Sequence, residues 1–126
     1  MAFGDIGGPV TELIVTCRTQ STGTVAIKRG DALVLTGNYT VEHAAAAGGV
    51  VVGQALVDRD RNSAAIPVRL RGICEFAYTG TAPTVGGTVG IVASATAGKV
   101  AVPASGSGRG LIVKTDTTAG TVQVLL

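Results

Sequence analysis

The fold class is decided by four short stretches near the end of the chain: Gly90-Ile91-Val92-Ala93, Lys99-Val100-Ala101-Val102, Leu111-Ile112-Val113-Lys114 and Thr121-Val122-Gln123-Val124-Leu125-Leu126. Each stretch alternates apolar residues with small or polar ones, which is the period of a half-buried β-strand. Turns of Gly, Ser, Ala and Thr separate the stretches. The pattern predicts a small all-β module, and none of the four stretches carries a carboxylate, histidine or cysteine that would suit catalysis.

The composition of the whole chain agrees with this fold class. The chain has 126 residues, 19 of them glycine, with no Trp, two Tyr and two Phe. Charged residues make up 14%, against about 25% in an average soluble domain. We therefore expect one domain over residues 12–126, a small antiparallel β-sandwich or β-barrel filled by small side chains. Because 46% of the chain is hydrophobic, we also expect apolar surface to be covered in an oligomer.

Further strands are predicted in the first two thirds of the chain, at residues 13–18, 24–28, 32–36 and 50–57. Residues 43–49 contain four alanines before two glycines, which favours either one helical turn or a loop. From Ile66 to Tyr78 the alternation runs unusually far, and Gly72 is the natural position for a bulge or corner. On this pattern Arg69, Arg71 and Glu75 share an outward face. Residues 79–87 are predicted to be a loop.

Two segments are candidates for contact with a partner. Residues 1–11 are too poor in strand formers to be core, and they indicate either an extended N-terminal arm or a frayed terminus. The arm would present Ala2, Phe3, Ile6 and Val10. Residues 58–63 form the most charged run and contain Arg59 and Arg61. This run is predicted to be a solvated hairpin tip, with a docking loop as the alternative.

The sequence offers little for catalysis or cofactor binding. Gly106-Ser107-Gly108-Arg109-Gly110 superficially resembles a phosphate-binding loop, but a strand pattern follows it where such a loop needs a helix. Asp58 with Asp60, or Glu75 with Asp116, could be proposed as carboxylate pairs, and His43 as a base. None has the context of an acid–base pair or a triad. We therefore predict no enzyme, no cofactor and no metal site.

The remaining sequence features limit where the protein is expected to occur and which partners it is expected to have. A net charge of +2 with scattered Lys and Arg does not predict nucleic-acid binding. No apolar run is long enough for a transmembrane helix, and Met1-Ala2-Phe3-Gly4-Asp5 lacks the features of a signal peptide. We expect synthesis in the cytoplasm and, for Cys17 and Cys74, buried thiols rather than a disulfide.

Four ordered segments resemble a known family: Ile27-Lys28-Arg29-Gly30-Asp31-Ala32-Leu33-Val34-Leu35, Val51-Val52-Gly53-Gln54-Ala55-Leu56, Val68-Arg69-Leu70-Arg71-Gly72-Ile73-Cys74-Glu75-Phe76 and Val122-Gln123-Val124-Leu125-Leu126. In order and spacing, from residue 24 to residue 126, the chain resembles the capsid cement proteins, the head-decoration proteins of tailed bacteriophages. The resemblance implies a β-sandwich or β-barrel that sits as a homotrimer on the outside of the expanded capsid. Such a protein bridges major capsid subunits and stabilises the shell.

The same resemblance implies where contacts would lie. They would involve the N-terminal arm, the 58–62 loop, and the face with Arg69 and Arg71. The family brings no catalytic motif, nucleic-acid contact or membrane contact. Two other classes stay open: another virion part, such as a tail-tube or spike module, and a carbohydrate-binding module. The second has few aromatic residues from which to build a sugar platform.

Overall fold

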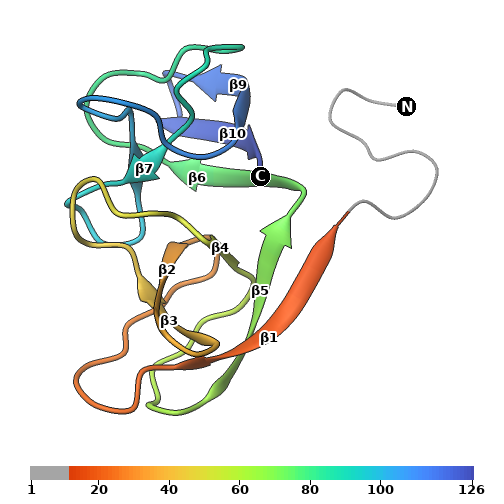
Figure 1. Ribbon diagram of the computed structural model, residues 1–126, viewed down its shortest axis with the longest axis vertical. Coiled ribbons are helices and arrows are strands. Elements are labelled where there is room, and N and C mark those ends of the chain that lie inside the picture. Colours follow the sequence, from red (N-terminus) through yellow and green to blue (C-terminus); the bar gives the residue numbers. More distant parts are fainter. Residues whose placement is uncertain (1–11) are drawn as a thin grey trace.

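The computed structural model describes residues 12–126, which form ten strands and no helix (Figure 1). A closed five-stranded barrel, in the order β1-β3-β2-β4-β5, is followed by a three-stranded sheet, β6-β10-β9, and a two-stranded sheet, β7-β8. The predicted all-β class is confirmed, and the barrel is the form it takes. The strands are β1 Leu13–Thr19, β2 Ala32–Gly37, β3 Thr40–His43, β4 Gly53–Ala55, β5 Ala65–Arg71, β6 Ile73–Ala77, β7 Val92–Ala93, β8 Val100–Ala101, β9 Leu111–Asp116 and β10 Thr121–Leu125.

The barrel is closed unevenly around β1. This strand pairs antiparallel with β5 from Leu13 to Arg18, but it pairs with β3 only through Arg18–Thr40 and Thr19–Val41, in parallel. Alternate β1 residues, among them Val15 and Cys17, face a barrel core that is built mainly from aliphatic side chains. That core contains Cys17, Val25, Ile27, Leu33, Val41, Ala55, Ile66 and Val68.

Gly72 makes the corner between the barrel and the second sheet. Its φ of 117° lies in the region that L side chains rarely adopt, so the predicted corner is confirmed. Before it, Ile66 and Val68 enter the barrel core; after it, Cys74 and Phe76 enter the second core. The corner places β5 and β6 in different sheets, so Arg69 and Arg71 lie on the barrel and Glu75 lies on the second sheet.

The four stretches at the end of the chain all contain strands, in two sheets. β9 and β10 form an antiparallel hairpin that continues onto β6, whereas β7 and β8 pair only with each other. The second core lies beneath them, and Phe76 is its largest fully buried side chain. The other side chains of this core are mainly Ala, Val, Ile and Cys, in line with the expectation of small side chains.

Two expectations about the first half of the chain are wrong. Residues 24–28 form no strand: Ile27 makes a single bridge to Arg59, although Val25 and Ile27 are buried like strand residues. Residues 50–57 form only the short β4. This strand pairs with β2 at just two positions, opposite Ala32 and Leu33. Of the two alternatives predicted for residues 43–49, the structure has the loop, over residues 44–49. The unpredicted β3 precedes that loop and is joined to β2 through Asn38 and Tyr39.

Candidate functional site

The side chain of Arg109 is one of the connections between the barrel and the rest of the fold. The backbone of Arg109 bridges to Ile91, and its guanidinium donates to three carbonyl oxygens. Nη1 lies 3.0 Å from the oxygen of Val51 and 2.5 Å from that of Val52, and Nη2 lies 2.8 Å from that of Leu70. The arginine of the glycine-rich run therefore serves to hold two parts of the fold together.

Arg109 has no carboxylate among the partners recorded for it in residues 12–126. Its pKa is lowered by desolvation and, to a smaller extent, by the positive charge of Arg71. An arginine nevertheless stays protonated in proteins, so carbonyl dipoles alone balance this partly buried cation. Gln54 adds a second connection, because its Nε2 donates to the Glu75 carbonyl at 2.6 Å.

The charged 58–63 run lies between β4 and β5, as predicted, and is tied down at several points. Arg59 exchanges backbone hydrogen bonds with Ile27, and its Nε donates to the Ala65 carbonyl at 2.7 Å. The side-chain amide of Asn62 donates to the carbonyls of Gln20 and Gly23. The Arg61 side chain is exposed. Of the two predicted contact arginines in this loop, Arg61 is the one that presents its charge to solvent.

The other two predicted contact arginines, Arg69 and Arg71, also differ in how exposed their side chains are. Arg69 is half-buried, forms an ion pair with Glu12 at 3.2 Å, and donates from Nη1 to Gln54 Oε1 at 3.1 Å. Arg71 is exposed. The structure therefore uses Arg69 within the fold and leaves Arg71 accessible, although the two lie two residues apart on β5.

The candidate reactive groups gather in two places. Glu75 and Asp116 line one small pocket of the β6-β10-β9 sheet together with Lys114, and the charges of His43 and Asp58 act on Asp31. Asp31 accepts a hydrogen bond from the Lys28 backbone, and its pKa is raised by desolvation, as in a partly buried turn. His43 Nδ1 lies 3.3 Å from the Ala26 carbonyl oxygen. Between residues 12 and 126, no cluster of His, Cys, Asp and Glu has the geometry of a metal site. The same part of the chain contains no helix that is long and apolar enough to cross a membrane.

Both cysteines are buried free thiols. Cys17 belongs to the barrel core and Cys74 to the second core. Desolvation raises the pKa of each thiol. Both side chains therefore act as small apolar groups, as expected from the sequence.

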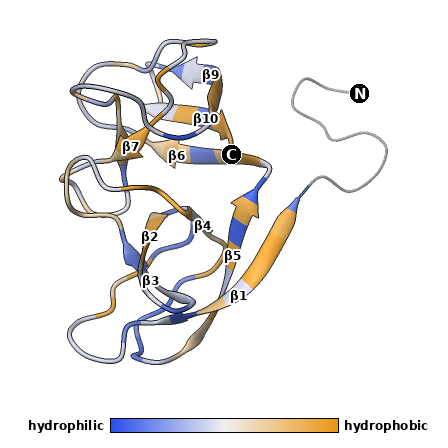
Figure 2. Cartoon of the chain, in the orientation of Figure 1, coloured by the Kyte–Doolittle hydropathy of each residue, from blue (hydrophilic) through white to orange (hydrophobic). Residues whose placement is uncertain are grey.

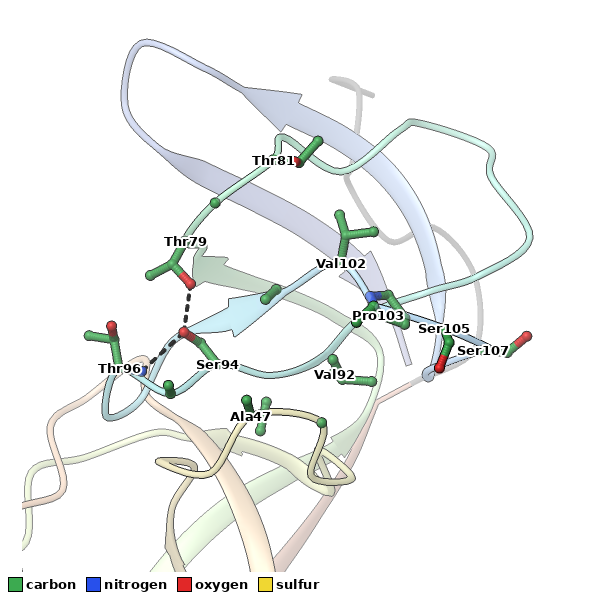
Figure 3. Close-up of a pocket in the computed structure, with 16 residues that line it drawn as sticks. Ala47, Thr79, Thr81, Val92, Ser94, Thr96, Val102, Pro103, Ser105 and Ser107 are labelled. Carbon is green, nitrogen blue, oxygen red and sulfur yellow. Dashed lines mark hydrogen bonds between the residues drawn. The ribbon is translucent and has the colours of Figure 1, made fainter.

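A pocket of about 800 Å³ opens beside β7 and β8 (Figure 3). Its polar side chains are hydroxyls, including Thr79 and Ser94, whose oxygens lie 2.6 Å apart. Ser94 Oγ also accepts a hydrogen bond from the Thr96 backbone. The other residues that line the pocket are small or carry hydroxyls, and none of them is charged or aromatic, so the pocket offers a ligand neither a charged group nor an aromatic platform.

A more apolar groove of about 590 Å³ opens where β1 separates from the β2–β3 turn. We call it the barrel groove. Leu35 is 55% exposed and Tyr39 69% exposed at its rim. Figure 2 shows that β1 is hydrophobic along much of its length. The groove is lined by Cys17, Leu35, Gly37, Tyr39, Val52 and Leu70, together with Asn38 of the turn.

A second exposed apolar feature lies on the β6-β10-β9 sheet. Leu125 pairs with Ile73 on one side and with Leu111 on the other. Leu125 is 44% and Leu111 45% exposed, and Ile73 is half-buried. We call these three residues the outer row. Gln123 lies two residues before Leu125 and pairs with Glu75 and Lys114, so the polar pattern expected of a solvated sheet face resumes there.

Sequence reasoning did not identify the barrel groove or the outer row, since each is assembled by strand register. The predicted contacts Ala2, Phe3, Ile6 and Val10, and the proposed arm over residues 1–11, lie outside the described residues. Comparison with protein-family models found no match, and comparison with curated proteins found none either.

Proposed function

We propose that this chain is a capsid cement protein, which binds the outside of an expanded phage head as a homotrimer and stabilises the shell by bridging major capsid subunits. The observation that carries the proposal is the outer row. Solvated antiparallel sheets usually carry polar residues on their outer face, whereas three apolar side chains from three strands meet here. An apolar row in this position suits contact with another protein.

The chemistry of the described residues supports a structural role. Arg109, Arg69 and Arg59 are engaged in holding segments of the fold together. The pocket beside β7 and β8 is lined by hydroxyls and small side chains. Each copy on a shell needs only a modest contact, because a trimer that engages several subunits binds through multivalency. The proposed location is the outer surface of the virion, after synthesis in the host cytoplasm.

In this proposal the N-terminal segment and the exposed Arg61 and Arg71 contact the shell. Deleting residues 1–11 should leave the fold intact and lower the occupancy on expanded capsids. The measurement is co-sedimentation with capsids stripped of decoration, with circular dichroism to check the fold. Unchanged occupancy would remove the segment from the contact, and saturable binding to tails instead of heads would move the protein to another virion part.

The outer row gives a sharper test of the trimer and shell contacts. We expect Leu125→Lys to weaken capsid binding by about tenfold or more, because the contact loses one buried aliphatic side chain and gains a charge that must be desolvated. Leu125 is already half exposed, so the fold should tolerate the change. Binding isotherms from co-sedimentation would measure the effect.

The matched control is Gln123→Lys. It adds the same charge on the same strand and the same face, two residues away, beside the carboxylate of Glu75. We expect this variant to bind like the unsubstituted protein. If both variants lose binding equally, net charge rather than the outer row governs attachment.

A further inference from the structure

Strand β1 has one edge that no strand among residues 12–126 covers. From Leu13 to Cys17 it pairs with β5 on one side only, and its pairing with β3 begins at Arg18. Figure 1 shows β1 running along the outer margin of the barrel. Leu13 and Ile14, at the start of this edge, are each 48% exposed. An edge of this kind presents backbone N–H and C=O groups to which another strand can add.

The hydrogen bonds of β1 show which of its backbone groups face the open edge. The Arg18 N–H donates to the Tyr39 carbonyl, on the side away from β5. Because alternate residues of a strand direct their N–H and C=O groups to the same edge, Ile14 and Thr16 direct theirs to that side as well. The pairing of Thr16 agrees with this assignment, because its neighbour on β5 is Pro67, which has no N–H to donate.

A second copy of the same strand fits this edge when the two strands run antiparallel and are centred on Val15. Ile14 of each copy then lies opposite Thr16 of the other copy, and these two residues exchange both of their backbone hydrogen bonds. The contact is symmetric, with its two-fold axis beside Val15. The N–H groups of Ile14 and Thr16 that face the open edge all find acceptors in this way, through four hydrogen bonds between the copies.

Charge complementarity favours this register over its neighbours. Glu12 comes just before the paired residues and lies alongside Arg18 of the other copy, where the pairing with β3 begins. The Glu12 carboxylate contacts Arg69 through one oxygen, and Arg18 contacts Thr40 through Nε, so each side chain has further polar atoms for a contact between copies. A register shifted by two residues in either direction would bring Arg18 alongside an uncharged residue.

The same register accommodates the exposed side chain of Leu13. Alternation places Leu13 on the face of β1 that carries Val15 and Cys17, and those two side chains pack in the barrel core. In the symmetric pair Leu13 lies opposite Cys17 of the other copy, and Cys17 lines the barrel groove. Each copy therefore buries an exposed leucine at the groove of the other, which adds apolar burial to the hydrogen bonds.

We infer that two copies of this chain associate through antiparallel pairing of their β1 edges, centred on Val15, with Leu13 of each copy at the barrel groove of the other. The outer row lies on a different sheet, so this contact leaves it uncovered and can join copies that belong to neighbouring trimers. The inference goes beyond the proposed function and does not depend on binding to a shell.

Disulfide crosslinking in the free, full-length protein tests the register. Leu13→Cys places a thiol opposite Cys17 of a second copy, which is a free cysteine. A disulfide needs the two Cα atoms within about 7 Å, and directly opposed residues of two strands meet this condition. Cys74 stays in place, because it is fully buried in the second core. Mild oxidation followed by non-reducing electrophoresis should give a covalent dimer.

Two control variants define the contact. Ile14→Cys introduces a thiol at a position of the same exposure, but on the other face of β1 and opposite Thr16, so it should give no crosslink. Leu13→Cys combined with Cys17→Ala should give none either, because the two introduced thiols are offset by about 14 Å of strand. Crosslinking in either control, or none from Leu13→Cys alone, would overturn the inference. Products larger than a dimer would also overturn it, since a two-fold contact closes between two copies.

Thr16→Pro supplies a second measurement that needs no introduced thiol. The Thr16 N–H faces the open edge, so proline removes no hydrogen bond from the fold of one copy but removes two of the four bonds between copies. Sedimentation equilibrium should show the dissociation constant of the pair raised by about tenfold or more.

Thr16→Val is the matched control, because it keeps the N–H and should leave the dissociation constant nearly unchanged. Circular dichroism checks that both variants are folded. Equal dissociation constants for Thr16→Pro and Thr16→Val would contradict the inference. All of these measurements are made without capsids, so their failure is distinguishable from failure of the proposed function.

Discussion

Arg109→Met is expected to lower the free energy of unfolding by about 3–5 kcal/mol. Hydrogen bonds from a charged donor contribute more than neutral ones, and the substitution leaves three partly buried carbonyl oxygens without their donor. The three oxygens belong to Val51, Val52 and Leu70, which come from two segments of the barrel, while Arg109 precedes β9. Methionine keeps the length of the side chain and removes all of its donors. Urea unfolding followed by circular dichroism measures the loss.

Arg61→Met is the matched control, since it removes the same charge from an exposed side chain. We expect it to change stability by no more than about 0.5 kcal/mol. Arg109→Lys should fall between the two, because an ammonium keeps the charge but lacks the planar fork that reaches several oxygens. If Arg109→Met unfolds at the same urea concentration as Arg61→Met, the guanidinium is not what holds the barrel to the second sheet.

The role of Arg109 was hidden from sequence analysis for a physical reason. Its carbonyl partners lie between 39 and 58 positions away, and a carbonyl oxygen carries no residue-type signature. The sequence correctly predicted that a strand follows Gly106-Ser107-Gly108-Arg109-Gly110, because that prediction needs only the local alternation of β9. The same limit applies to Arg69, whose partners Glu12 and Gln54 come from two other segments.

Strand positions were predictable where alternation is local and the strand is long. The two-residue period from Ile66 to Phe76 identified the buried residues and the corner at Gly72. It could not show that the corner divides those residues between two cores. Residues 24–28 misled the prediction because Val25 and Ile27 are buried without strand pairing beyond one bridge.

The candidate surfaces were less predictable than the core. The outer row exists only because the register of β10 places Leu125 between Ile73 and Leu111. The open edge of β1 likewise follows from where β3 begins, at Thr40. Alternation assigns a side chain to one face of a strand, but it does not say which strand lies alongside.

Gly53→Ala is expected to destabilise the barrel strongly, although it adds only one methyl group. A Cβ at this position would run into the backbone carbonyl of Arg69 and approach Val68 Cγ1 to 2.9 Å. Gly53 begins β4, whose next two residues pair with Arg69 and Val68 of β5. Since β4 has only three residues, the added methyl would separate it from β5 rather than displace a flexible side chain. We expect a loss of about 3 kcal/mol or more in the free energy of unfolding.

Gly37→Ala tests whether that loss comes from crowding rather than from glycine chemistry in general. Gly37 ends β2, and a Cβ there would meet Thr40 atoms at 3.5 Å, an ordinary contact. Neither Gly37 nor Gly53 has a positive φ, so alanine strains neither backbone. Gly37→Ala should therefore change stability by less than about 1 kcal/mol. Equal urea midpoints for the two variants would mean that β4 and β5 can separate without cost, and that the barrel does not depend on their close approach.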